Sequence, residues 1–152
     1  MVRVVTPPVA VSVTAAVVAV GLAAGGTRIG HANGRQPATT SAVTRPGAPD
    51  DVYIGATFGL LVSRDDACSF RWICEQNIGF AGTFDPKYAV ARDGTIYATT
   101  FSGLRVSRDG GCTFVTATEE APKADPGRFA GLWVDAIGLG PSDEVWVGTA
   151  ES

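Results

Sequence analysis

Apolar and polar positions alternate in short runs over residues 52–149, and clusters of turn-forming residues separate the runs. Alternation with a period of two is typical of strands that bury one face. No stretch after residue 25 carries a helical apolar period of useful length. The expected strands are 52–57, 60–64, 70–74, 87–92, 95–101, 104–107, 114–117, 132–138 and 144–149. The pattern therefore predicts an all-β domain.

One segment of this pattern occurs twice. Residues 104–114, LRVSRDGGCTF, have a partner 44 positions earlier, LLVSRDDACSF at residues 60–70. Laid over each other without a gap, residues 52–76 and 96–120 are identical at ten of 25 positions. An incomplete third repeat starts at residue 145, where VWVG (Val145–Gly148) is aligned with Thr95–Ala98 and Val52–Gly55. A period of this length indicates stacked supersecondary units, most often propeller blades.

The second copy has the residues of a tight turn between two strands. Ser107 and Asp109 carry short polar side chains that can bond the N–H groups of the turn. Gly110–Gly111 supplies positive φ angles without the penalty of a Cβ atom. Thr113 and Phe114 start the next strand, and Phe114 is expected to fill the gap between strands.

The first copy keeps Ser63, Asp65 and Phe70 at the matching positions, but Asp66 and Ala67 replace the two glycines. Asp tolerates left-handed backbone geometry fairly well, whereas Ala does not. We therefore expect this copy to be degenerate and its turn to differ.

The pattern Ser-x-Asp-x-Gly-x-Thr-Phe resembles the Asp-box of the sialidase-like (BNR-repeat) β-propellers. The resemblance covers residues 52–150 and implies an incomplete propeller with four-stranded blades: three strands of one blade, four of the next and two of a third. Such an arc cannot close by itself, so we expect a fragment of a longer protein, with assembly of several copies of the chain as the alternative. In that family the box lies on the outer rim and is structural, so the resemblance implies a fold and not an activity. Asp65 and Asp109 would then stand on separate blades, too far apart for a catalytic carboxylate pair.

Sialidases resemble one another in an arginine triad, a Tyr–Glu nucleophile pair and an Asp acid/base, and an Arg-Ile-Pro motif usually marks the first arginine. This chain has no Arg-Ile-Pro, so we carry over no catalytic residue and expect no cofactor. Two function classes stay open. The preferred one is an exported, non-catalytic propeller module that binds a protein or a glycan at the cell surface. The alternative is the N-terminal part of a secreted sialidase-type glycoside hydrolase whose catalytic residues lie outside this chain.

The first third of the chain differs in composition from the rest. Residues 9–24 form an uncharged apolar run after a basic start, which predicts a signal peptide over 1–32. An uncleaved membrane anchor is the alternative, because Val4–Ala24 has about the length that a bilayer needs. Residues 33–50 lack a period and are expected to be a flexible spacer before the domain, 51–152. We therefore expect a secreted or extracytoplasmic protein, with a membrane contact only if the apolar segment is uncleaved.

Charge and cysteine content narrow the range of partners. Cleavage after Ala32 would remove two of the 12 basic residues and leave 10 against 15 acidic residues, a net charge of −5. Such a balance argues against nucleic acid as a partner. Cys68 and Cys74 could form a small-loop disulfide if the segment between them bends, and two buried thiols are the alternative. Cys112 is left over, and three cysteines without clustered histidine make a poor metal site.

The remaining aromatic and basic candidates have structural interpretations. Trp72, Trp133 and Trp146 could stack on sugars, but aromatic residues in strands mostly pack between sheets, so we expect them in the core. Arg64 and Arg108 follow the serine of each box and are expected to be solvated charges.

Overall fold

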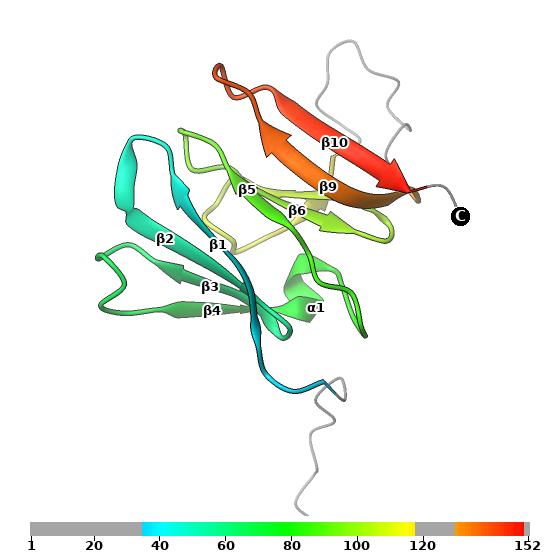
Figure 1. Cartoon of the computed structure of the whole chain (residues 1–152), viewed down its shortest axis with the longest axis horizontal. Coiled ribbons are helices and arrows are strands. Elements are labelled where there is room, and N and C mark those ends of the chain that lie inside the picture. The colour runs from blue at the N-terminus through cyan, green and yellow to red at the C-terminus, as the bar shows by residue number, and fades with distance from the viewer. Residues whose placement is uncertain (1–34, 118–129, 151–152) are drawn as a thin grey trace, which may run out of the picture. The chain divides into compact units, whose positions relative to one another are not determined.

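The computed structural model describes residues 35–117 and 130–150 (Figure 1). All of the described residues belong to one compact unit of the chain. The predicted signal peptide, 1–32, therefore lies outside the described residues. Within the described ranges, no helix has the length and apolar character needed to cross a membrane.

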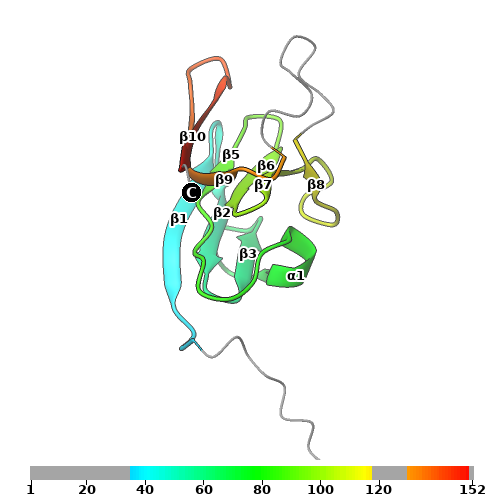
Figure 2. The same ribbon diagram turned by 90° about the vertical axis from the view of Figure 1, so that its right-hand side faces the viewer.

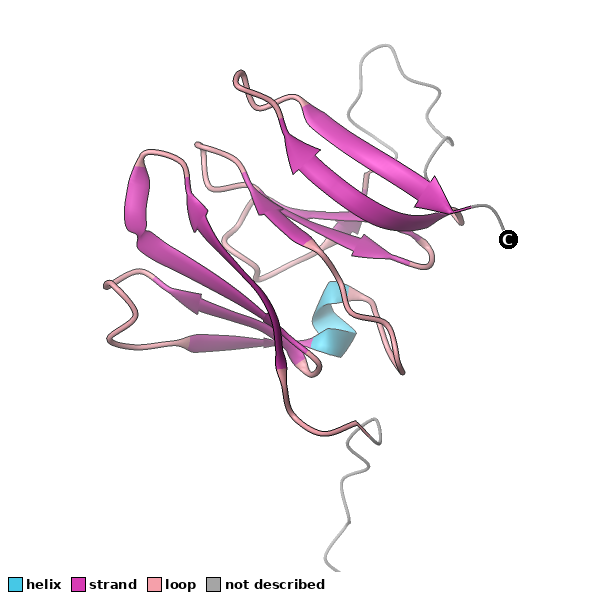
Figure 3. Ribbon diagram, in the orientation of Figure 1, coloured by secondary structure: helices cyan, strands magenta, loops and turns pink. Residues whose placement is uncertain are grey.

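The described residues are mostly strands in three antiparallel sheets, as the sequence pattern predicts (Figure 3). The first sheet has the order β1 (Thr39–Arg45), β2 (Ala48–Ala56), β3 (Gly59–Ser63) and β4 (Arg71–Cys74). The second has the order β5 (Tyr88–Val90), β6 (Ile96–Thr100), β7 (Gly103–Ser107) and β8 (Val115–Thr116). The third pairs β9 (Trp133–Leu139) with β10 (Val145–Ala150). A single helical turn, α1 (Glu75–Ile78), lies in the segment that connects the first two sheets.

A first apolar core fills the space between the first and second sheets, which follow one another in Figures 1 and 2. Alternate residues of each strand point into it, so Tyr53 and its cross-strand partner Val62 meet Ile96 from the second sheet. Tyr53 and Ile96 are fully buried. Burying an aliphatic side chain such as that of Ile96 stabilises the folded state by about 1.5–3 kcal/mol.

A second core joins the second and third sheets. Leu104 and Val106 of β7 pack with the fully buried Val134 of β9. Tyr97 joins them from the second sheet, and the partly buried Val145 and Val147 join from the third. The second sheet is therefore covered by a neighbouring sheet on each of its faces.

The prediction of a flexible spacer over 33–50 is wrong from Thr39 onward. Residues 39–45 form β1, and β2 already starts at Ala48 after a turn in which Gly47 has a φ of 82°. The strand TTSAVTR has one large apolar residue, Val43, which packs against the first core. A strand of Thr, Ser and Ala gives almost no hydrophobic alternation, although Thr favours extended backbone. The first sheet consequently has four strands and not the expected three.

The third sheet repeats the second in a register that differs by one residue from the predicted alignment. Val145 and Val147 face the second sheet, as Ile96 and Ala98 face the first. Val145 therefore corresponds to Ile96, not to Thr95. Trp146 then stands at the position that Tyr97 and Tyr53 occupy in the earlier sheets.

Candidate functional site

The turn between β7 and β8 is closed by four hydrogen bonds to two side chains. The hydroxyl of Ser107 donates to Asp109 Oδ1 at 2.8 Å and accepts from the N–H of Gly111 at 2.8 Å. Thr113 donates its N–H to Asp109 Oδ1 at 2.9 Å and its hydroxyl to Oδ2 at 2.7 Å. The hydroxyl of Ser107 and both carboxylate oxygens of Asp109 are thus used within the turn itself.

The first copy forms the same four bonds. Ser63 donates to Asp65 Oδ1 at 2.7 Å and accepts from the N–H of Ala67 at 3.0 Å. Ser69 donates its N–H and hydroxyl to the two oxygens of Asp65 at 2.9 and 2.6 Å. Asp66 and Ala67 adopt φ angles of 56° and 62°, close to the 71° and 94° of the two glycines in the second copy. The expectation of a different turn is wrong, because the side-chain network holds two L-residues in left-handed geometry.

These hydrogen bonds decide the electrostatics of the two carboxylates. The hydroxyl of Thr113, followed by its N–H and by Ser107, holds the pKa of Asp109 well below its usual range. The hydroxyl of Ser69, followed by that of Ser63, lowers the pKa of Asp65 in the same way. A carboxylate that stays ionised and fully bonded is a poor general acid, so the geometry gives both residues a role in holding the turn.

The two phenylalanines that follow the boxes differ in burial. Phe114 is 7% exposed and belongs to the core between the first two sheets, whereas Phe70 is 41% exposed. Phe114 was expected to fill a gap between strands, and it instead fills one between sheets. Phe70 has the same place in the first sheet, on the side that faces away from the second.

The three cysteines are free thiols. Cys68 and Cys112 are exposed in the two box turns, and Cys74 is half-buried at the end of β4. No bond joins Cys68 to Cys74 in this structure, where β4 lies between them along the chain, and the disulfide stays a prediction. Among residues 35–117 and 130–150, no group of three or more His, Cys, Asp or Glu gathers in a way that could hold a metal ion.

Two tyrosines, Tyr53 and Tyr88, are buried in the first core. Burial raises the pKa of Tyr88 and of Tyr53, and their hydroxyls have no hydrogen-bond partner among the described residues. Both phenols stay neutral at physiological pH, which makes them weak nucleophiles. Arg64 lies over the ring of Tyr53 at 5.3 Å and pairs with the buried Asp51, so it is not the purely solvated charge that the sequence suggested.

An aromatic surface lies at the end of the sheets opposite to the boxes. Consecutive connections of an antiparallel sheet alternate between its two ends, so the β6–β7 turn and the start of β9 lie at the other end from the box turns. Phe101 of that turn is 4.5 Å from Phe84 and 5.1 Å from Trp133, measured between ring centroids. Phe84 is buried, whereas Phe101 is 49% and Trp133 36% exposed. We call the exposed rings of Phe101 and Trp133, with the buried Phe84 packed against Phe101, the aromatic surface.

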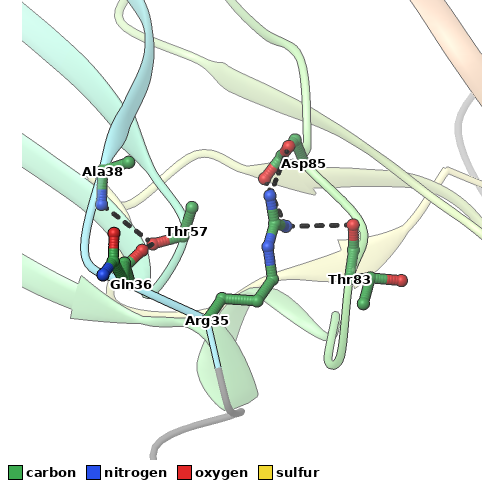
Figure 4. Close-up of polar contacts among 6 residues, drawn as sticks. All are labelled: Arg35, Gln36, Ala38, Thr57, Thr83 and Asp85. Carbon is green, nitrogen blue, oxygen red and sulfur yellow. Dashed lines mark hydrogen bonds and ion pairs between the residues drawn. The ribbon is translucent and has the colours of Figure 1, made fainter.

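Charged residues lie close in sequence to the residues of the aromatic surface. Lys87 pairs with Asp135 at 3.5 Å, and both side chains are about half exposed. Figure 4 shows Arg35 reaching from the segment before β1 to the loop before β5, where it donates to both oxygens of Asp85 at 2.7 and 2.9 Å and to the carbonyl of Thr83. This hydrogen bonding raises the pKa of Arg35 further, and the pair fixes the loop that carries Phe84.

No protein-family model, curated protein or solved structure matches this chain. The chemistry of the described residues therefore carries the functional argument.

The sequence interpretation placed the tryptophans in the core, and this is wrong. Trp72, Trp133 and Trp146 are 59%, 36% and 71% exposed. Trp72 lies on the outer face of the first sheet, where its indole N–H donates to the carbonyl of Phe58 at 3.1 Å. Phe101 was not singled out from the sequence at all. An aromatic residue in a two-residue turn, with Ser102 beside it, was the signal that could have found it.

Proposed function

We propose that this chain is an exported, non-catalytic β-propeller repeat module of the sialidase-like kind, and that it binds a glycan at the cell surface. The repeated four-bond turn in two four-stranded antiparallel sheets supports the propeller assignment, because that family carries such a box between neighbouring strands of each blade. The apolar run of residues 9–24 supports export.

The aromatic surface is the observation that carries binding. Phe101 and Trp133 expose their rings next to each other. Single exposed apolar residues are common on protein surfaces, whereas neighbouring ones are typical of interaction sites. A pyranose ring offers an apolar C–H face to stack on such rings and hydroxyls around its edge. Asp135, two residues after Trp133, pairs with Lys87, and the two side chains can supply an acceptor and a donor for those hydroxyls.

Binding of the chain to a panel of immobilised neutral and sialylated oligosaccharides tests this proposal. We expect Trp133→Ala and Phe101→Ala to weaken binding at least about fivefold each, since an aromatic contact contributes about 1 kcal/mol beyond its burial. Val115→Ala is the matched control, because Val115 is exposed to 54% but lies in the outermost strand of the second sheet. Unchanged binding by both aromatic variants would overturn the assignment of the site, and binding to no oligosaccharide would overturn the glycan.

A further inference from the structure

The two outermost sheets each present a face that has no neighbouring sheet among the described residues. In the first sheet, the outward face carries Ala42, Val52 and Ile54, with Trp72 of β4 on the same face, because the residues between them point into the first core. In the third sheet, the outward face carries Trp146, which alternates with Val145 and Val147 of the second core.

These two faces resemble the two sides of an interface that occurs twice inside the chain. Inside the chain, the sheet face that carries a central-strand tyrosine, Tyr53 or Tyr97, packs against the next sheet. Trp146 stands at the same position of the third sheet. On the receiving side, Ile96 and Ala98 of the second sheet accept the tyrosine face of the first.

The receiving residues have equivalents on the first sheet. Val52 corresponds to Ile96 and Ile54 to Ala98 through the 44-residue repeat. The innermost strand matches as well, since Ala42 pairs with Ile54 in the way that Tyr88 pairs with Ala98. The smaller Ala42 in place of a tyrosine leaves room for an aromatic group larger than the one that the second sheet receives.

The third sheet differs in a way that makes room for the larger aromatic side chain. The cross-strand partner of the aromatic residue is Val43 in the first sheet, Ala89 in the second and Gly138 in the third. The partner shrinks where Trp146 replaces tyrosine, so the larger indole fits the same face. Trp146 is nevertheless 71% exposed, which is far more than its equivalent Tyr53 with 0%.

We propose that the outward face of the third sheet packs on the outward face of the first sheet of a second copy of this chain, with Trp146 on Val52 and Ile54. The contact is heterologous, so it makes either a closed ring or an open chain of copies. Two copies supply six sheets, which lies within the four to eight blades of closed propellers. The closed ring therefore rests on the proposed propeller fold, and the partner that covers both exposed faces is a second copy of this chain.

Analytical ultracentrifugation of the chain as its host exports it tests the proposal, with twice the mass of one chain as the expected result. Trp146→Glu spoils the third-sheet face and Ala42→Glu spoils the first-sheet face, and both positions are exposed, so neither change disturbs a core. We expect each variant to raise the dissociation constant of the dimer by at least about 30-fold, because a buried unpaired charge opposes association. Trp146→Tyr and Val115→Glu are controls that keep the dimer.

Mixing the two charged variants gives the sharpest result. Each variant alone lacks one of the two required faces, but Trp146→Glu keeps the first-sheet face and Ala42→Glu keeps the third-sheet face. The mixture should therefore form a one-to-one complex, whereas a symmetric pairing through one face would leave one variant dimeric by itself. A monomer for the unmodified chain, or no complex in the mixture, overturns the proposal. Oligosaccharide binding by that monomer would leave the proposed function intact.

Discussion

The left-handed alanine in the first box turn is the most direct point at which to perturb the fold. Ala67 has a φ of 62°, and its counterpart in the second copy is Gly111 with a φ of 94°. Left-handed geometry costs an L-residue roughly 1–2 kcal/mol, and replacing Ala by Gly loosens the unfolded chain by about 0.4–1 kcal/mol. Ala67→Gly should therefore stabilise the protein by about 0.5–1 kcal/mol.

The reverse change in the second copy should have the opposite sign and a larger size. A Cβ atom on Gly111 would lie 2.1 Å from Cδ1 of Ile73 in the neighbouring sheet, so Gly111→Ala adds overpacking to backbone strain. Overpacking costs about 1–3 kcal/mol, which brings the expected loss to roughly 2–4 kcal/mol. Gly82→Ala is the matched control, because Gly82 has a φ of 76° with no atom near the position of the Cβ, and it should show the strain alone.

Urea unfolding followed by far-UV circular dichroism measures all three variants at one protein concentration, since self-association would shift apparent stability. The expected order of stability is Ala67→Gly, the unmodified chain, Gly82→Ala and then Gly111→Ala. An Ala67→Gly protein less stable than the unmodified chain would refute the reasoning, because it would mean that the first turn is not held in left-handed geometry.

Four further predictions concern charge, folding, packing and export. The folded-state pKa of Asp109 is depressed, so its contribution to stability is complete above the unfolded pKa of about 3.9 and is lost as the pH falls through the folded value. Asp109→Asn should therefore weaken the dependence of the free energy of unfolding on pH in the acid range. Asp109→Ala should lower any activity only as far as it lowers the folded fraction, and a fully folded but inactive protein would contradict this. Arg105 donates to the carbonyls of Ile78 and Phe114, so Arg105→Leu should cost about 1–3 kcal/mol for each carbonyl left buried, as urea unfolding would show. Mass spectrometry of the protein from its host should show loss of about the first 23 to 32 residues; full-length chain in the membrane fraction would favour an anchor.

The sequence predicted the regular elements well where alternation is strong. Strands such as β3 and β7 carry Leu and Val on the face that packs on the next sheet, and their bounds agree with the prediction to within a residue or two. The strand β1 was missed because Val43 is its one large apolar residue. The strand is held by packing against its neighbours and not by an apolar alternation of its own, so its sequence carries little sign of it.

The site was harder to predict than the strands. Exposure of Trp72 and Trp146 depends on whether another sheet covers their face, and strand aromatics carry no local sign of this. The first box turn looked degenerate because propensity forbids Ala67 a positive φ, yet four hydrogen bonds from Ser63, Asp65 and Ser69 override that preference. Phe101 and Trp133 meet only through tertiary structure, across the connection between β8 and β9.

Native-state hydrogen exchange in the two box turns tests most directly whether both copies build one structural unit. The N–H groups of Ala67 and Ser69 in the first copy, and of Gly111 and Thr113 in the second, all donate to box side chains. We predict that these four amides exchange slowly and at comparable rates, although Ser69 and Thr113 belong to exposed residues. Fast exchange at Ala67 and Ser69 with protection at Gly111 and Thr113 would contradict the account, because the first sheet would then lack the turn that makes it a repeat of the second.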